Sequence, residues 1–346
     1  MRTIGAAALV VCALATQHRP AIGQEACGPD KLGVARTAAI DAAGGPHFGA
    51  RYHDRKTKPL LADGEVVLTF DDGPSRAYTR SILGTLAAQC TKATFFMVGR
   101  MALADPDTAK EVAAQGHTVA THTWSHVSLA GLADDKAQTE IELGFSAVQQ
   151  ALGRPIAPFF RFPYLRHSDF TLHHLESRQI ATFDIDIDSR DFATRNAAAL
   201  HDRVIAGVKA RRKGIILFHD IHASTARALP LILADLRSLG LRVVHLAPKT
   251  AAKTVAEYDK LAQQELARRR LAIARSPLAK RAVTWPMGSG GAKGGVQDAK
   301  LAAKDTKAVK AADDAAPPTA PGATASPPAP PAPQEDWAAE LWSRAQ

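Results

Sequence analysis

The feature that most constrains the fold is an alternation of short apolar runs with amphipathic stretches between Glu65 and Leu246. The apolar runs are rich in Val, Ile, Leu and Phe. They predict strands at Glu65–Phe70, Ala93–Val98, His117–Thr121, Pro158–Phe162, Thr182–Ile187, Gly214–His219 and Leu241–Leu246. Repeated strand-then-helix units predict a parallel sheet in an α/β protein. Periodicity leaves an open doubly wound sheet and a closed barrel as alternatives, and about seven strands fit the barrel slightly better.

Three of the stretches between the strands carry distinct helix signals. Asp105 as N-cap and Pro106 as first helical residue begin one helix, which ends at Gly116. A second helix starts near Asp134 and ends at Gly153. A third is indicated by apolar residues at helical spacing, namely Leu200, Val204, Ile205 and Val208.

The start of the chain is typical of an exported protein. A short positive start precedes an apolar run over residues 4–15 and a small-residue cleavage site at residues 21–23. The run is too short to cross a bilayer, which takes about 20 apolar residues. Residues 1–23 are therefore predicted to be a signal peptide, with an uncleaved N-terminal anchor as the alternative. Export predicts a periplasmic or secreted protein, and no later segment is apolar enough to form a transmembrane span.

Changes in composition divide the rest of the chain. Residues 24–62 are predicted to form an N-terminal extension and residues 63–249 the main folded domain. Residues 250–282 are predicted to be a charged helical extension, with a helix-favouring stretch over Thr254–Arg275. Residues 283–346 are rich in Ala, Pro and Lys, which bury too little apolar surface to impose order, so a disordered tail is expected.

The net positive charge indicates which binding partners to expect. A net charge of +9 favours contact with anionic surfaces such as cell-wall polymers or lipid head groups. Much of the excess lies beyond residue 250, where a solvated basic extension is the alternative. No recognisable nucleic-acid-binding motif accompanies the charge, so nucleic acid is not expected as a partner.

Two cysteines remain once the signal peptide is removed. Cys12 would leave with it, so that Cys27 and Cys90 form an even pair in an oxidising compartment. A disulfide between them is one hypothesis and two reduced thiols the other. A sequence does not reveal whether the two Cβ atoms can meet.

The strongest chemical feature is a pair of adjacent carboxylates. Asp71 and Asp72 follow the first predicted strand and precede Gly73 and Pro74. Adjacent side chains at a strand end project in different directions, so one carboxylate can bind a metal while the other accepts a proton. A solvated turn is the alternative, because Asp, Gly and Pro all favour turns.

A second feature is a pair of histidines. His122 and His126 are four residues apart, which predicts that they lie on the same side of a helical turn and share a metal ion. With Asp72 they form a set of two imidazoles and one carboxylate, which leaves coordination positions for water and substrate. No Glu follows the first His, which argues against a thermolysin-like protease.

Three further runs end predicted strands or follow them. One has Arg161 among aromatic residues, one has several aspartates between Asp186 and Asp191, and one ends with His219 and Asp220. The neighbouring carboxylate of Asp220 is predicted to raise the pKa of His219 and keep it protonated. A structural ion pair of Arg161 and a structural His219 are the alternatives. In a β/α barrel such strand ends meet at one face.

Together these five groups resemble, in order and spacing, the motifs of the NodB-type polysaccharide deacetylases, carbohydrate esterase family 4. The matching runs are Thr69–Pro74, His122–His126, Arg161–Tyr164, Asp188–Phe192 and Leu217–His219. The resemblance covers about residues 64 to 248, so the domain over residues 63–249 is expected to be the catalytic one. It implies a distorted (β/α) barrel of the NodB-homology, glycoside hydrolase-deacetylase type. It also implies a divalent metal, with Zn²⁺ expected first and Co²⁺, Mn²⁺ or Ni²⁺ as alternatives.

The resemblance also implies the central roles. Asp72, His122 and His126 would bind the metal. Asp71 would be the general base and His219 the general acid.

Further residues would support these groups. By the same resemblance, Arg161 would hold the base in place, and Asp191 would orient Arg161 or tune the acid. The backbone N–H of Tyr164 would help to bind the oxyanion. Leu217 and Phe192 would line the acetyl pocket.

The chain departs from the family pattern at three positions. Phe162 replaces a common Pro, Leu165 follows Tyr164 where Gly is frequent, and Phe192 replaces a Trp. We expect these residues at the rim or wall of the acetyl pocket rather than at the metal.

The expected reaction is metal-dependent hydrolysis of N-acetyl groups on a carbohydrate polymer, such as chitin-like or peptidoglycan N-acetylglucosamine, with release of acetate. The expected partner is thus an acetylated polysaccharide or oligosaccharide. An O-acetyl glycan esterase with the same site is the main alternative. Hydrolysis of a small cyclic amide is disfavoured by the signal sequence. An inactive carbohydrate-binding domain is disfavoured because every residue needed for chemistry is present.

Overall fold

The computed structural model describes residues 27–50 and 59–275 of the chain. The predicted signal peptide, the predicted tail and residues 276–282 of the charged extension lie outside the described residues. The strands are β1 (Arg36–Ile40), β2 (His47–Phe48), β3 (Glu65–Asp71), β4 (Thr94–Met97), β5 (Thr118–Thr121), β6 (Phe159–Phe160), β7 (Ala181–Phe183), β8 (Ile187–Asp188), β9 (Gly214–His219) and β10 (Arg242–Pro248). The helices are α1 (Arg76–Ala88), α2 (Gly99–Ala104), α3 (Pro106–Ala114), α4 (Asp134–Leu152), α5 (Asp169–Ser177), α6 (Ala197–Arg211), α7 (Ala223–Ser238) and α8 (Ala256–Arg275).

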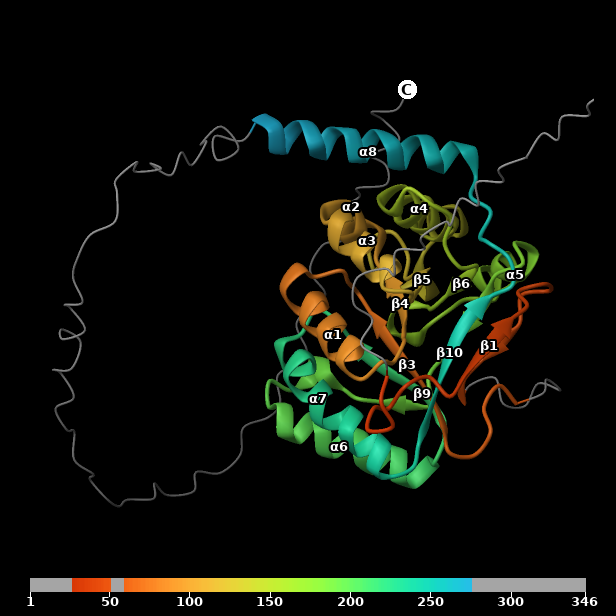
Figure 1. Cartoon of the computed structure of the whole chain (residues 1–346). Helices are drawn as coiled ribbons and strands as arrows, with labels where there is room; N and C mark the ends of the chain where they lie inside the picture. Colours follow the sequence, from red (N-terminus) through yellow and green to blue (C-terminus); the bar gives the residue numbers. More distant parts are fainter. Residues whose placement is uncertain (1–26, 51–58, 276–346) are drawn as a thin grey trace, which may run out of the picture. The chain divides into compact units, whose positions relative to one another are not determined.

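The strands form a parallel, distorted barrel, as predicted. From β3 the ladder runs through β4, β5, β6 and β7 on one side and through β9 and β8 on the other. β7 and β8 are separated only by residues 184–186, so the chain itself joins the two ends of the ladder. The helices lie around the outside of these strands (Figure 1).

One predicted strand is wrong, and two strands were not predicted. The predicted strand Thr182–Ile187 is two short strands, β7 and β8, because the chain turns there from one end of the ladder to the other. The predicted N-terminal extension contains β1 and β2, which pair with β10 and β7. Both are short, and β1 is rich in Ala, so neither has a marked period in the sequence.

The helix predictions are confirmed. Asp105 caps α3 by accepting a hydrogen bond from the Thr108 N–H, and Gly153 ends α4 in the left-handed conformation. α8 lies within the helix-favouring stretch and buries Tyr258. None of the helices in the described ranges combines the length and apolar character that a membrane crossing requires.

The side chains of β3 point alternately toward the barrel interior and away from it. Val67 belongs to an interior cluster with aromatic residues of β4, β6 and β7, whereas Phe70 stacks on Phe95 and Phe218. Successive strand side chains point to opposite faces. Thr69 and Asp71 therefore share the interior face of Val67, and Asp71 lies at the carboxyl end of the barrel.

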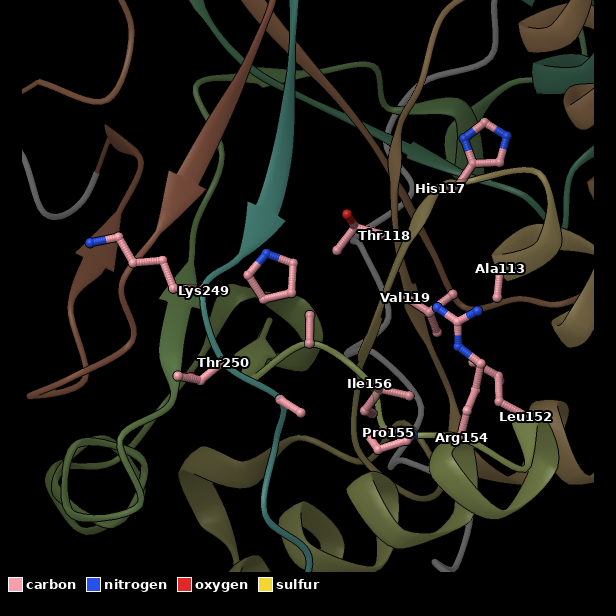
Figure 2. A pocket seen from close by; sticks show the side chains of 13 residues that line it. Ala113, His117, Thr118, Val119, Leu152, Arg154, Pro155, Ile156, Lys249 and Thr250 are labelled. Carbon is pink, nitrogen blue, oxygen red and sulfur yellow. The ribbon is translucent and has the colours of Figure 1, made fainter. Parts of the chain in front are cut away.

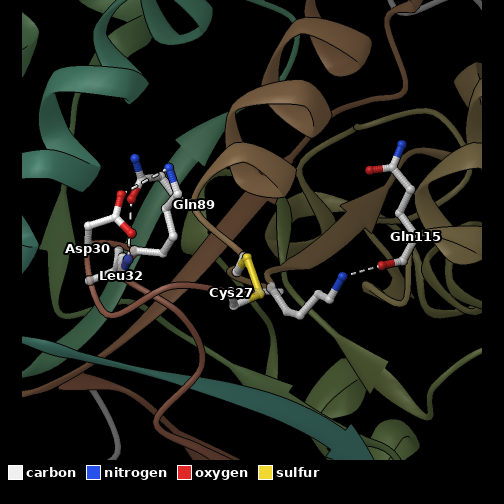
Figure 3. The surroundings of a disulfide bond; sticks show 8 residues. Cys27, Asp30, Leu32, Gln89 and Gln115 are labelled. Carbon is white, nitrogen blue, oxygen red and sulfur yellow. Dashed lines mark hydrogen bonds and ion pairs between the residues drawn. A yellow bond between two sulfur atoms is a disulfide. The ribbon is translucent and has the colours of Figure 1, made fainter. Parts of the chain in front are cut away.

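Cys27 and Cys90 form a disulfide with a Cα–Cα distance of 5.9 Å (Figure 3). Nearby, the Leu32 N–H donates to the side chain of Gln89 at 3.2 Å, and the Gly33 N–H donates to the Gln89 carbonyl at 2.9 Å. Of the two hypotheses for the cysteines, the structure thus has the disulfide, which fastens the N-terminal segment to the end of α1.

A pocket of about 340 Å³ opens where β5 begins, between that strand and the segment that follows β10. Its walls include Thr118, Arg154 and Lys249 (Figure 2). Lys249 pairs with Asp41 at 3.3 Å. The chemical residues predicted from the sequence follow the opposite ends of the strands, so this pocket is separate from them.

Candidate active site

Three potential metal ligands meet where β3 and β5 end. The Oδ1 atom of Asp72 lies 3.2 Å from Nε2 of His126 and 3.6 Å from Nε2 of His122. All three ligand atoms lie within 4.8 Å of one another. A tetrahedral zinc ion with bonds of about 2.0–2.2 Å would place neighbouring ligand atoms about 3.3–3.6 Å apart. The separations involving Asp72 therefore fit a shared ion of this size.

The protonation state and hydrogen bonds of these ligand atoms also suit a bound metal. The Nδ1–H of His122 donates to the carbonyl of Arg161 at 2.8 Å, which leaves Nε2 with its lone pair toward Asp72. Burial holds the pKa of His122 well below its usual range, so its imidazole is neutral. Among the described residues, the buried Oδ1 of Asp72 has no hydrogen-bond partner. A buried carboxylate oxygen without a donor fits a cation in this position.

The prediction that the two histidines lie on a helical turn is wrong. Residues 122–126 form an irregular loop after β5. The left-handed φ angles of Thr123 (70°) and His126 (64°) turn the chain so that the imidazoles meet, with ring centroids 5.0 Å apart. Asp72 also has a positive φ of 76°. Non-glycine residues in this region persist only where their surroundings hold them, and they concentrate at functional sites.

Asp71 points into the barrel and pairs with Arg161. Its Oδ1 accepts from the guanidinium at 2.8 Å, and both side chains are buried. Arg161 also donates to Thr69 Oγ1 of β3 and to the carbonyl of Phe183 of β7, so acceptors on two strands fix the plane of its guanidinium. Burial raises the pKa of Asp71 to about 6, although the charges of Arg161 and His219 act to lower it.

His219 is the register partner of Asp71 across β3 and β9. Its Nδ1 lies 2.6 Å from Oδ1 of Asp191, and its backbone N–H donates to Oδ2 of the same carboxylate at 2.7 Å. Burial acts to lower the pKa of His219. The hydrogen bond and charge of Asp191, with the charges of Asp72 and Asp71, more than offset burial and raise it to about 9.

The prediction that Asp220 raises the pKa of His219 is therefore wrong, because Asp191 does so. Asp220 faces the other way and accepts from Thr79 Oγ1 at 2.6 Å. A Cβ on Gly73 would lie 2.1 Å from its carboxylate, so glycine is required there. Of the two tasks expected for Asp191, its contacts fit the tuning of His219, since they are to His219 and Thr225.

The large apolar side chains around the site differ in exposure. Tyr164 is 62% exposed with its ring 4.8 Å from that of His126, and Phe192 is 58% exposed with its ring 6.0 Å from that of His219. Leu217 is buried in β9, two residues before His219. Phe162 is also buried and packs on Phe160, so it belongs to a wall rather than to an open rim.

Sequence reasoning missed three polar neighbours of the site. Thr225 of α7 donates to Asp191, and Glu140 of α4 accepts from Ser125 within the histidine loop. The ring centroid of His222 lies 5.8 Å from that of His219. Asp191, His219 and His222 form a second group whose ligand atoms lie within 4.8 Å. Each missed residue sits on or beside a helix whose sequence period marks only which face is apolar.

Comparison with known proteins agrees with this geometry. The model of the family described as polysaccharide deacetylase matches residues 61–182. A chitooligosaccharide deacetylase of Sinorhizobium fredii is 34% identical over 167 residues, which cover 48% of this chain and 77% of the relative. A peptidoglycan-N-acetylglucosamine deacetylase of Listeria monocytogenes is 32% identical over 179 residues, covering 52% of this chain. The match spans only 37% of the length of the Listeria protein.

A solved structure is also similar. The peptidoglycan deacetylase of Bdellovibrio bacteriovorus superposes with a TM-score of 0.56 at 34% identity, over 62% of this chain and 59% of that one. The match to the rhizobial relative covers more than two thirds of that protein. The chain described here therefore belongs to the polysaccharide deacetylase family.

Proposed function

We propose that the protein is an exported, metal-dependent hydrolase that removes N-acetyl groups from a carbohydrate polymer and releases acetate. The observation that carries this proposal is the convergence of three metal-ligand atoms, a buried carboxylate and a paired imidazole at one end of the barrel. The named activities of the relatives, on peptidoglycan N-acetylglucosamine and on chitooligosaccharides, support N-acetylglucosamine as the substrate unit.

Asp72, His122 and His126 would hold the metal, with Zn²⁺ as the first candidate because two imidazoles and a carboxylate suit it. Co²⁺, Mn²⁺ and Ni²⁺ are alternatives with the same ligands. When bound, such a cation lowers the pKa of water and polarises a carbonyl group.

Asp71 would act as the general base. Arg161 fixes its Oδ1, so Oδ2 remains to accept the proton of the attacking water. Oδ2 lies 3.9 Å from Nε2 of His122, which keeps it beside the ligand group. A buried carboxylate with a pKa raised toward neutrality is a better proton acceptor than a solvated one.

His219 would act as the general acid. An amine is a poor leaving group unless it is protonated, and the pKa of about 9 keeps the imidazole charged at neutral pH. Asp191 holds Nδ1, so Nε2 is the nitrogen that can deliver a proton to the leaving amine. The backbone N–H of Tyr164 would donate to the oxyanion, the interaction that usually contributes most to acyl transfer.

The exposed rings of Tyr164 and Phe192, one beside His126 and one beside His219, would contact the sugar, and Leu217 would line the acetyl pocket. The disulfide supports an oxidising compartment, and hence a periplasmic or secreted location. The basic C-terminal part would add contact with an anionic wall or membrane surface.

The test is acetate release from N-acetylated and O-acetylated glycans by protein stripped with a chelator and then reloaded with one divalent metal at a time. We expect release from N-acetylglucosamine oligomers or peptidoglycan, restored best by Zn²⁺, and loss of release in Asp71→Asn. Release from O-acetylated glycans alone would instead support the esterase. Glycan binding without acetate release under any metal would support an inactive carbohydrate-binding domain.

A further inference from the structure

Helix α4 supports the loop that carries the second histidine ligand. At Gly144 the helix approaches the loop so closely that an added Cβ would lie 2.7 Å from the backbone carbon of Thr123. Glu140 precedes Gly144 by four residues and therefore lies on the same helix face. Its backbone carbonyl accepts from the Trp124 N–H at 2.8 Å.

The carboxylate of Glu140 binds the same loop. It is 1% exposed, and it accepts from the backbone N–H of Ser125 at 2.9 Å and from the Ser125 hydroxyl at 2.6 Å. Within the loop, the hydroxyl oxygen of Thr123 accepts from the backbone N–H of His126 at 3.0 Å. Hydrogen bonds thus tie Glu140 to Trp124 and Ser125, and a further one ties Thr123 to His126 within the same loop.

These bonds act where the backbone is strained. Thr123 and His126 both have left-handed φ angles, which L-residues with a Cβ adopt only when neighbours hold them. The ring of His122 is fixed separately by the Arg161 carbonyl, whereas His126 is fixed through its loop. A loop released from α4 would let His126 move away from Asp72 and leave two ligands.

We propose that Glu140 is a positioning residue for the metal site: its carboxylate binds Ser125, next to His126 in the loop, and thereby holds His126 at ligand distance from Asp72. The inference rests on the proposed metal site of Asp72, His122 and His126. Groups that hydrogen-bond to the surroundings of metal ligands commonly change metal affinity by about 10–100-fold when they are removed.

The test is the dissociation constant for Zn²⁺ of the full-length protein, measured by competition with a chromogenic chelator. Glu140→Gln keeps the shape but turns one acceptor oxygen into a donor, facing loop groups that are themselves donors. We expect binding about tenfold weaker or more, with acetate release recovered at higher free Zn²⁺.

Helix α4 provides a matched control. Glu142 is also 1% exposed, but its carboxylate binds His174 at 2.8 Å and Arg178 at 2.8 Å, away from the histidine loop. Glu142→Gln should lower the melting temperature and leave the Zn²⁺ dissociation constant unchanged. Ser125→Ala, which keeps Glu140 and removes one of its partners, should weaken Zn²⁺ binding by a smaller factor, and its effect should not add to that of Glu140→Gln.

The outcomes separate the two proposals. Wild-type protein that binds no Zn²⁺ overturns the proposed metal site, and the inference with it. Wild-type protein that binds Zn²⁺, with Glu140→Gln unchanged or weakened no more than Glu142→Gln, overturns the role of Glu140 alone. If Glu140→Gln does not fold, Ser125→Ala decides in the same way, and an unchanged dissociation constant there contradicts the inference.

Discussion

Asp71 and Asp72 are adjacent in sequence and yet occupy different chemical environments. Asp71 continues the β3 ladder, so its side chain points into the barrel and meets Arg161. Asp72 leaves the strand with a φ of 76°, which turns its carboxylate toward His122 and His126. The end of one strand thus gives two neighbouring carboxylates separate surroundings, one with a fixed cationic partner and one with two imidazoles.

Substitution of each carboxylate should have a different effect on Zn²⁺ binding and acetate release. Asp71→Asn removes the proposed base, so acetate release should fall by about 10²–10⁴-fold while Zn²⁺ binding persists. Asp72→Ala should abolish tight Zn²⁺ binding, because only two imidazoles remain. Metal content and acetate release measured on both variants check this, and loss of Zn²⁺ binding in Asp71→Asn alone would exchange the two roles.

The pH dependence of activity should be bell-shaped, and its alkaline limb should depend on Asp191. His219 works only when protonated, so activity should be lost as pH rises through its pKa of about 9. Asp191→Asn removes the charge that offsets burial, so the pKa of His219 falls and the limb moves to lower pH. The measurement is kcat/KM against pH.

A control for this experiment lies on the same segment. Asp188 is exposed and bonds only the local backbone of Arg190 among the described contacts, so Asp188→Asn should leave the alkaline limb in place. An unshifted limb in Asp191→Asn would remove Asp191 from its proposed role.

At the residue scale the sequence predicted the identity of the groups better than their contacts. Strand ends and motif spacing brought Asp71, Asp72, His122, His126 and His219 to one face. The carboxylate that raises the pKa of His219 was predicted to be Asp220, because that residue is adjacent in sequence, but it is Asp191. The side chain of Asp191 reaches His219 across β8 and β9, a contact that depends on strand order.

At the element scale, α4 and the histidine loop depend on each other. The sequence signals at Asp134 and Gly153 located α4 well, since caps and glycine act locally. The loop after β5 was predicted as a helical turn because a spacing of four suits a helix. Its conformation depends instead on contacts with α4, which local sequence does not contain.

Gly144→Ala tests this packing. An added Cβ would meet the backbone of Thr123, so either the helix or the loop must shift. We expect a loss of about 1–3 kcal/mol in the free energy of unfolding, together with weaker Zn²⁺ binding. Gly84→Ala in α1 is the control, because nothing lies within 4 Å of its added Cβ.

For the control we expect neutral or raised stability, by up to about 1 kcal/mol, since Ala favours a helix interior over Gly. Urea unfolding and zinc titration measure both effects. Equal stability and equal Zn²⁺ affinity in the two variants would contradict the proposed contact between α4 and the loop.

At the scale of the whole molecule, the barrel is completed by segments far apart in sequence. Its class followed from the alternation of strands and helices, and a barrel was expected from the number of strands and the family resemblance. The place where the ladder ends was not predicted, because β7 and β8 read as one strand. The contribution of the N-terminal segment was also missed. Strand β1 carries Arg36, which binds Glu65 of β3 through two hydrogen bonds and holds the pKa of that carboxyl at about 2.

The disulfide acts at the same scale. It closes a loop of 63 residues between the N-terminal segment and α1. Loop-closure entropy for that length predicts a loss of about 4 kcal/mol in unfolding free energy for the double variant Cys27→Ser, Cys90→Ser. Chemical unfolding with and without reductant measures it. Reductant should weaken the wild type and leave the double variant unchanged; no effect on the wild type would contradict the bond.

The most direct measurement is a crystal structure of the zinc-loaded protein, with anomalous scattering recorded on both sides of the zinc absorption edge. We predict one strong peak about 2.0–2.2 Å from Asp72, His122 and His126, with no protein ligand in at least one further position. A peak at Asp191, His219 and His222 instead, or no peak between Asp72 and the two histidines, would contradict it.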